Sequence, residues 1–92
     1  MLKVVYTSRF KKDYKALLKR GVNVESLNKT ILLISEEKQL PAINNDHPLK
    51  GSFTGSRECH LGFDWLLVYK IHKDILVLEL IRTGTHQDVF RD

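Results

Sequence analysis

The stretch from Trp65 to Arg82, WLLVYKIHKDILVLELIR, decides the fold that this sequence predicts. It contains two runs of apolar, β-branched and aromatic residues, 65–72 and 75–82, with only Lys73 and Asp74 between them. Because a two-residue connection has the length of a hairpin turn, we predict that the runs pair as antiparallel strands. Both faces of the runs are apolar over most of their length, as expected of central strands that other elements cover.

Two further strands extend the predicted sheet. Residues 57–61 predict a third strand before the hairpin, and residues 2–7, LKVVYT, predict a short N-terminal strand. The segment 41–56 is rich in Pro, Asn, Gly and Ser and lacks periodicity, so it predicts one long loop. A loop of this length in a small domain is more often functional than idle.

Two helices are predicted between the N-terminal strand and the loop. Thr7 or Ser8 can cap the first helix, and Gly21 ends it. Asn23 can cap the second helix, whose periodicity continues until Pro41 forces an extended backbone. The apolar stripes consist of Phe10, Tyr14, Leu17 and Leu18 in the first helix and of Val24, Leu27, Ile31 and Ile34 in the second. The element order predicts one α+β domain over residues 1–92, with a two-helix hairpin packed on a mainly antiparallel four-stranded sheet.

The composition limits the classes of protein to which this chain can belong. A chain of 92 residues has room for one domain, and 42% hydrophobic with 28% charged residues is typical of a globular fold. No run approaches the roughly 18 uncharged apolar residues of a membrane span, and no secretory signal is visible. Cys59 is the single cysteine, so it has no internal disulfide partner. These features predict a soluble protein of the reducing cytoplasm, without a membrane partner.

Positive charge is concentrated at one end of the chain. The first twenty residues carry a net charge of +6, from seven basic residues and Asp13, whereas the remainder carries −2. A cationic stripe is typical of a surface that binds nucleic acid or an acidic protein, although it is also compatible with a solvated helix face. The lysines of the first helix that lie outside its apolar stripe are Lys11, Lys12, Lys15 and Lys19.

Side chains suited to proton transfer and phosphate binding lie in the long loop and near the strand ends. They are His47, Arg57, His60, Asp64, Arg82 and His86. A pair of histidines can supply the base and the acid of a reaction near neutral pH, and arginine binds phosphate through a planar, charged fork. Metal-free RNA cleavage requires this combination, because one group deprotonates the 2′-OH and another protonates the departing 5′-oxygen.

Strand alternation sorts some of these side chains. It places Glu58 and His60 on one face of the 57–61 strand and Arg57 and Cys59 on the other. Three histidines can therefore converge on one sheet.

Four motifs follow one another along the chain: DHPLKG at 46–51, RECH at 57–60, DWLLVYK at 64–70 and RTGTH at 82–86, the last followed by Phe90. Together with the lysine-rich helices before them, they resemble the YafQ branch of RelE-type toxins, the toxin halves of bacterial type II toxin–antitoxin modules. The resemblance covers the whole chain and implies the RelE-like order β-α-α-β-β-β. The turn at 61–63 departs from the branch pattern without touching a catalytic position.

The resemblance implies a ribosome-dependent endoribonuclease that cuts messenger RNA in the ribosomal A site without a metal or cofactor. It makes His86 the general acid and places Arg82 at the scissile phosphate, whereas His47, His60 and Asp64 share base chemistry and RNA positioning. The partners would be an acidic antitoxin, mRNA and the bacterial ribosome with its 16S rRNA. The predicted RNA contacts are Lys50, Arg57, Trp65, Phe90, Lys11, Lys12, Lys15 and Lys19.

Several of these residues also have a structural interpretation, in which they support the fold and take no part in function. His47 can cap the loop backbone, His60 can be a buried structural histidine, and Arg57 can pair with a carboxylate instead of phosphate. Trp65 can pack beneath the site, and His72 belongs to no motif. Cys59 is predicted to be a buried hydrophobe because alternation turns it away from His60. The spacing of the histidines matches no compact metal motif, so we predict no metal site.

Two other classes of function compete with the nuclease. One is a non-enzymatic inhibitor of the same fold, such as the ParE toxins that bind DNA gyrase, but such inhibitors lack this set of histidines. The other is a nucleic-acid-binding module whose histidines make contacts without chemistry. Loss of cleavage with retained binding after substitution of His86 distinguishes an enzyme from a binder.

Overall fold

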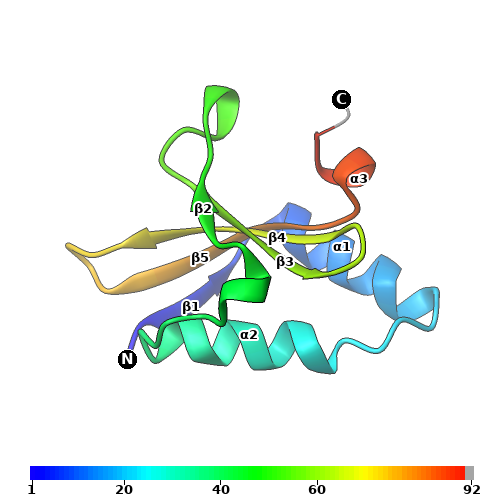
Figure 1. The fold of residues 1–92 in the computed structure, drawn as a ribbon, viewed down its shortest axis with the longest axis horizontal. Helices are drawn as coiled ribbons and strands as arrows, with labels where there is room; N and C mark the ends of the chain where they lie inside the picture. Colours follow the sequence, from blue (N-terminus) through cyan, green and yellow to red (C-terminus); the bar gives the residue numbers. More distant parts are fainter. Residues whose placement is uncertain (91–92) are drawn as a thin grey trace.

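The hairpin predicted from residues 65–82 lies at the centre of the sheet. In this computed structural model, β4 (Trp65–His72) pairs antiparallel with β5 (Val77–Gly84). The structure describes residues 1–90, so Arg91 and Asp92 of the predicted domain lie outside the described residues. The α+β fold class is confirmed: a mainly antiparallel sheet carries two long helices on one face (Figure 1).

The turn of this hairpin is longer than predicted. Ile75 and Leu76 belong to the connection rather than to the strand, and they are 64% and 58% exposed. Leu76 has a φ of 54°, in the left-handed region. The prediction of a two-residue turn was wrong, because Lys73-Asp74 lacks the Asn-Gly type of pair that favours such a turn. The connection has four residues instead.

The sheet has five strands in the order β1-β5-β4-β3-β2, one more than predicted. β1 (Lys3–Tyr6) pairs parallel with β5, and β3 (Arg57–Gly62) pairs antiparallel with β4. The additional strand, β2 (His47–Pro48), lies within the segment predicted as a loop and pairs with the outer edge of β3. Two residues are too short for a periodic signal, which explains why the sequence did not reveal this strand.

The rest of the predicted loop is also structured. Two 3₁₀ turns flank β2: η1 (Ala42–Asn44) and η2 (Gly51–Phe53). The side chain of Asn44 donates to the carbonyl of His60 at 2.7 Å, so η1 is fastened to β3. The segment is therefore held in place by the sheet.

The two long helices form where they were predicted, and the predicted cap of the first is confirmed. α1 (Ser8–Lys19) begins after Thr7, whose hydroxyl accepts from the backbone N–H of Phe10 at 3.0 Å, and it is followed by Gly21 at a φ of 76°. α2 (Glu25–Ser35) has Val24 rather than Asn23 at its N-cap position, although the side chain of Asn23 accepts from the backbone N–H of Glu25. α2 ends several residues before Pro41, and Glu37 takes a left-handed φ of 59° after it.

The core lies between these helices and one face of the sheet. Cys59 is fully buried there as predicted, and burial raises the pKa of its thiol to about 12. Leu18 is an exception to the predicted stripe, because it is 51% exposed between α1 and α2. The buried members of the core are Leu2, Phe10, Leu17, Leu27, Ile31, Ile34, Cys59, Leu67, Tyr69, Leu78 and Leu80.

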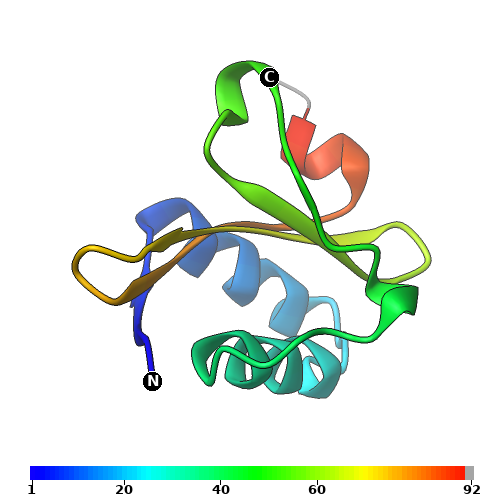
Figure 2. The ribbon, with the colours of Figure 1, turned by 60° about the vertical axis from the view of Figure 1, so that its left-hand side comes forward.

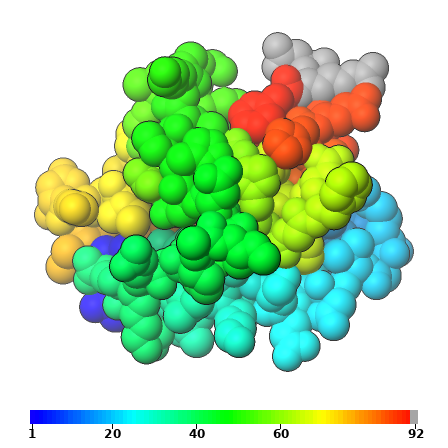
Figure 3. Space-filling model, in the orientation of Figure 1, coloured from blue at the N-terminus to red at the C-terminus, as the bar shows by residue number. Residues whose placement is uncertain are grey.

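The opposite face of the sheet carries the elements that the sequence did not predict. The segment around β2 and η2 stands over β3, and a short helix, α3 (His86–Phe90), follows β5 on the same side (Figure 2). The space-filling view shows this segment and α3 as neighbouring projections of the surface (Figure 3). Among residues 1–90, no helix combines the length and the apolar character needed to cross a bilayer.

Candidate active site

Three histidines converge on the sheet face opposite α1 and α2. His47 begins β2, His60 lies on β3 and His86 begins α3. The ring centroids of His47 and His60 are 6.0 Å apart, and those of His60 and His86 are 5.7 Å apart. The predicted convergence is confirmed, with His60 in the middle.

Glu58 is a member of this cluster that the sequence analysis did not assign. Its carboxylate Oε1 lies 3.1 Å from Nε2 of His60 and 4.0 Å from Nε2 of His47. The side chain is only 6% exposed, so the histidines provide the polar contacts that a buried carboxylate requires. The two-residue strand period, which puts Glu58 and His60 on one face, was the signal that could have identified it.

His47 is held with one nitrogen directed away from the backbone. Its Nδ1 lies 2.7 Å from the carbonyl oxygen of Asn45. A carbonyl only accepts, so Nδ1 carries the proton in the neutral ring and Nε2 keeps its lone pair. Nε2 is the nitrogen that faces Glu58. In this tautomer His47 is suited to accept a proton.

His86 is also held through Nδ1, but its partner is a carboxylate. Asp64, at a left-handed φ of 53° in the turn between β3 and β4, accepts from both the backbone N–H and Nδ1 of His86 through Oδ1, at 2.9 and 2.7 Å. The two hydrogen bonds from His86, the backbone one first, lower the pKa of Asp64. A carboxylate that accepts from Nδ1 stabilises the protonated ring and leaves Nε2–H available for donation.

Arg82 is anchored at the edge of the sheet. Its guanidinium donates to the carboxylate of Asp13 on α1 at 2.7 and 3.2 Å, and to the backbone carbonyl of Asp88 on α3 at 3.1 Å. Its side chain is 11% exposed. The hydrogen bond that Arg82 donates to Asp13 is the largest contribution to a raised pKa of Arg82. Arg82 thus connects α1, β5 and α3, and Asp13 is a second site-supporting residue that the sequence analysis missed.

Two predicted RNA contacts lie away from the histidine face. Arg57 pairs with Asp46, with Nε 3.2 Å from Oδ1, which agrees with the structural interpretation of this residue. The indole of Trp65 packs against the core and donates to the hydroxyl of Thr83 at 3.0 Å. From these positions Arg57 and Trp65 support the sheet, and the RNA contact predicted for each of them stays a prediction.

The other predicted contacts divide between the two sides of the sheet. Phe90 stacks edge-to-face on Phe53 of η2 with centroids 5.4 Å apart, so α3 and η2 touch beside the histidines. Lys50 is exposed immediately before η2. The lysines of α1 are exposed on the far side of the sheet from the histidines, as Figure 1 shows for α1. They are Lys11, Lys12, Lys15 and Lys19.

The site contains three possible metal ligands. One ligand atom from each of Glu58, His60 and His86 lies within 4.8 Å of the other two. Two imidazoles and a carboxylate are a donor set that zinc and copper accept, with a position left open. Sequence spacing did not reveal this group because β3 supplies Glu58 and His60, whereas α3, far along the chain, supplies His86.

Comparison with known proteins assigns the chain to one family. The family model described as "Bacterial toxin of type II toxin-antitoxin system, YafQ" matches residues 2–91. The chain belongs to the YafQ toxin family. It is 40% identical over 88 residues to the mRNA interferase toxin YafQ of Escherichia coli K12, a match that covers 95% of this chain and 94% of the relative.

Solved toxin structures superimpose closely on this chain. A metal-bound toxin from Helicobacter pylori has a TM-score of 0.92 at 41% identity, with 98% of this chain and 100% of that chain covered. YafQ in the E. coli DinJ–YafQ toxin–antitoxin complex has a TM-score of 0.86 at 36% identity, with 97% of each chain covered. The YafQ fold therefore extends over nearly the whole chain, including the segment around β2 and the α3 helix.

Proposed function

We propose that this YafQ-family protein is an mRNA interferase, an endoribonuclease that cleaves mRNA in the ribosomal A site. The observation that carries the proposal is the placing of two histidines on one surface with different partners at Nδ1. Nδ1 of His47 lies against a neutral backbone carbonyl, whereas Nδ1 of His86 lies against the carboxylate of Asp64, and in our proposal Nε2 of His47 accepts a proton and Nε2 of His86 donates one. The mRNA interferase activity named for the E. coli relative supports the same reaction.

In the proposed reaction, Nε2 of His47 takes the proton from a ribose 2′-OH. The 2′-oxygen then attacks the adjacent phosphorus, and the bond from phosphorus to the 5′-oxygen breaks. Nε2–H of His86 protonates the departing oxygen, which leaves a 2′,3′-cyclic phosphate and a 5′-hydroxyl. Each of these proton transfers contributes roughly 10²–10⁴ in rate, so both histidines are essential.

The remaining polar groups stabilise charge at the phosphate. His60 lies between the other two rings and is paired with the buried Glu58, so it is positioned to donate a hydrogen bond to a phosphate oxygen once RNA displaces that contact. Arg82 is held by Asp13 through Nε and Nη2, and its Nη1 has no hydrogen-bond partner among residues 1–90. We assign this nitrogen to the phosphate.

The shape of the site supports dependence on the ribosome. The side chains of His86 and Asp64 are 53% and 43% exposed, and that of His47 is 39% exposed. An open surface of this kind holds a flexible RNA strand poorly, because catalysis requires the 2′-OH, the phosphorus and the 5′-oxygen to be aligned. A ribosome that presents the mRNA in a fixed conformation supplies this alignment.

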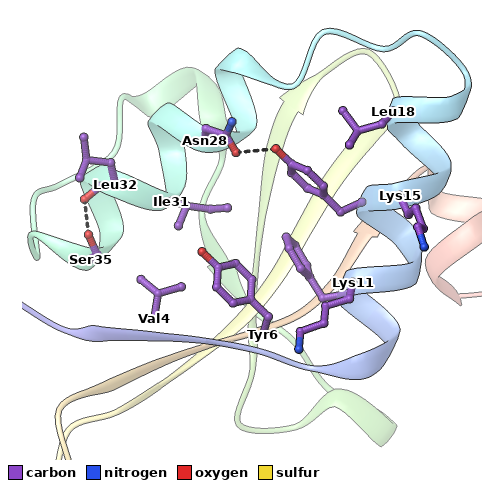
Figure 4. A pocket seen from close by; sticks show the side chains of 11 residues that line it. Val4, Tyr6, Lys11, Lys15, Leu18, Asn28, Ile31, Leu32 and Ser35 are labelled. Carbon is purple, nitrogen blue, oxygen red and sulfur yellow. Dashed lines mark hydrogen bonds between the residues drawn. The ribbon is translucent and has the colours of Figure 1, made fainter.

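The opposite side of the molecule suits an acidic antitoxin. A groove of about 710 Å³ runs between α1, α2 and β1, and Figure 4 shows apolar side chains along it with Lys11 and Lys15 at its rim. The amphipathic character of the groove favours an acidic, amphipathic segment of a partner protein. The existence of a DinJ–YafQ complex supports an antitoxin as the occupant.

Primer extension on a defined message in a reconstituted translation mixture tests the nuclease proposal. We expect discrete cuts that require both ribosomes and His86, and we expect His86→Ala to abolish them. His72→Ala is the matched control, because His72 also pairs with a carboxylate, Glu79 at 2.9 Å, but lies at the other end of β4. Blocked translation without cuts would instead indicate a binding inhibitor, and cuts without ribosomes would indicate a free ribonuclease.

A further inference from the structure

The residue immediately before His47 is fastened to the opposite side of the sheet. Oδ1 of Asp46 accepts from the hydroxyl of Tyr69 at 2.6 Å and from Nε of Arg57 at 3.2 Å. Arg57 also donates from Nη2 to the backbone carbonyl of Asp46 at 3.3 Å. Tyr69 is only 2% exposed and belongs to the core cluster, so this anchor is part of the rigid interior.

The register of the sheet explains why this anchor acts on His47. Consecutive residues of an extended segment point to opposite faces. Arg57 is opposite Tyr69 in the β3–β4 ladder, on the helix-covered face, whereas His47 is opposite Glu58 and shares the site face with it. Holding Asp46 on one face therefore directs the next side chain, His47, toward the other.

The contacts of Asp46 with Tyr69 and Arg57 also affect which ring nitrogen of His47 carries the proton. The carbonyl that accepts from Nδ1 belongs to Asn45, which has a left-handed φ of 45°. A non-glycine residue keeps such a conformation where its surroundings hold it. Asp46 is bonded to the carbonyl carbon of Asn45, so its contacts with Tyr69 and Arg57 fix the peptide whose oxygen selects the proton position on His47.

We propose that Asp46, held by Tyr69 and Arg57, is a positioning residue that orients His47 and sets its tautomer for the role of general base. The proposal rests on the proposed nuclease function for its kinetic consequence, but the orientation of His47 is a property of the free protein. Burial and the hydrogen bond to Asp46 raise the pKa of Tyr69, so its hydroxyl stays protonated and donating throughout the neutral range. Neither Asp46 nor Tyr69 would touch RNA.

The Tyr69→Phe variant tests the proposal, because it removes the hydroxyl donor and keeps the ring in the core. Nitrogen-15 NMR of the histidine rings in the free protein reports which nitrogen of His47 carries the proton. We expect the neutral His47 ring to hold its proton on Nδ1 in the wild type and to become a mixture of tautomers in Tyr69→Phe. An unchanged His47 signature in Tyr69→Phe would overturn the proposal, whatever reaction the protein catalyses.

Single-turnover cleavage on programmed ribosomes gives the second readout. We expect Tyr69→Phe to lower the cleavage rate about tenfold to a hundredfold, the order of loss that misplacement of a reacting group causes. Leu78→Val is the control for core packing, because Leu78 is fully buried on β5 and makes no contact with Asp46 in the hydrogen-bond network. It should retain cleavage at an equal or greater loss of thermal stability.

A double-mutant cycle separates positioning from a general structural role. If Tyr69 acts through His47, Tyr69→Phe has no further effect on the residual rate of His47→Ala. The same fold-loss in both backgrounds would contradict the proposal. If the wild-type protein does not cleave mRNA at all, the proposed function fails, and the NMR signature still decides whether Asp46 orients His47.

Discussion

Nδ1 of His86 lies 2.7 Å from Oδ1 of Asp64, and the same oxygen accepts from the backbone N–H of His86 at 2.9 Å. This pair joins the turn between β3 and β4 to the first residue of α3, although 22 residues separate them in sequence. A carboxylate in this position both orients the ring and stabilises its charge when Nε2 holds a proton. The ring that acts as the acid in the proposed reaction is therefore oriented before RNA arrives.

Replacement of Asp64 by Asn keeps the shape of this contact and removes the charge. We expect Asp64→Asn to lower the single-turnover cleavage rate by about tenfold to a hundredfold, a smaller loss than the roughly 10²–10⁴ expected for His86→Ala. The free energy of unfolding should change little, because ion pairs between exposed groups contribute little to stability. Cleavage by Asp64→Asn at the wild-type rate would show that the carboxylate does not assist the acid.

The pairing should also show a defined response to acid. Hydrogen bonds from His86 lower the pKa of Asp64 below its ordinary value of 3.8. A depressed pKa of a carboxyl group means that the contact stabilises the fold fully above pH 3.8, and that this stability is lost as the pH falls through the lower, folded-state value. An NMR titration from pH 6 to 2 should show the Asp64 carboxyl and the His86 amide shifting together below pH 3.8. If the Asp64 carboxyl titrated with a midpoint at or above pH 3.8, the result would contradict its hydrogen bonds with His86.

Transition-metal ions should inhibit the enzyme. Zinc or copper held by Glu58, His60 and His86 would occupy the nitrogens that the reaction uses, so we expect added zinc to stop cleavage and a chelator to restore it. The metal-bound toxin from Helicobacter pylori shows that a relative with this fold takes up a metal. Glu58→Gln should weaken zinc binding, measured by calorimetry. Activation by zinc, or loss of activity on chelation alone, would contradict metal-independent chemistry.

Charge on the α1 side should govern antitoxin association. Lys11 and Lys15 lie at the rim of the groove, so replacing both by Ala should slow association with the antitoxin and weaken its dependence on salt. Cleavage measured without antitoxin tests the RNA contact predicted for the same two lysines, which lie across the sheet from the histidines. Stopped-flow mixing at several salt concentrations measures the effect. An association rate that salt does not change in the wild type would argue against this surface.

Much of the fold could be predicted because it depends on local patterns. The periodic stripes, the cap at Thr7 and the left-handed Gly21 specify α1 and its end, and the apolar runs specify β4 and the core part of β5. Ile75 and Leu76 were misassigned because an apolar run alone does not say where a turn begins. β2 and α3 are short elements held by tertiary contacts, which leave no periodic signal.

In the candidate site, too, some features could be predicted from the sequence and others could not. The histidines, Arg82 and Asp64 were identifiable by residue type and motif, whereas the contacts that hold Arg82 and Asp46 were not, because the two partners in each contact are distant in sequence. Asp13 meets Arg82 across 69 positions, and Asp46 meets Tyr69 across 23. Glu58 was visible on the correct face, but only the structure shows that its buried carboxylate lies among the histidines.

The assignment of His47 as base and His86 as acid is tested most directly by changing the leaving group. In an mRNA whose scissile 5′-oxygen is replaced by sulfur, the leaving thiolate needs no proton, so the general acid becomes dispensable. On programmed ribosomes we predict that this substrate restores rapid cleavage to His86→Ala and leaves His47→Ala inactive. Rescue of His47→Ala, or failure to rescue His86→Ala, would contradict the account.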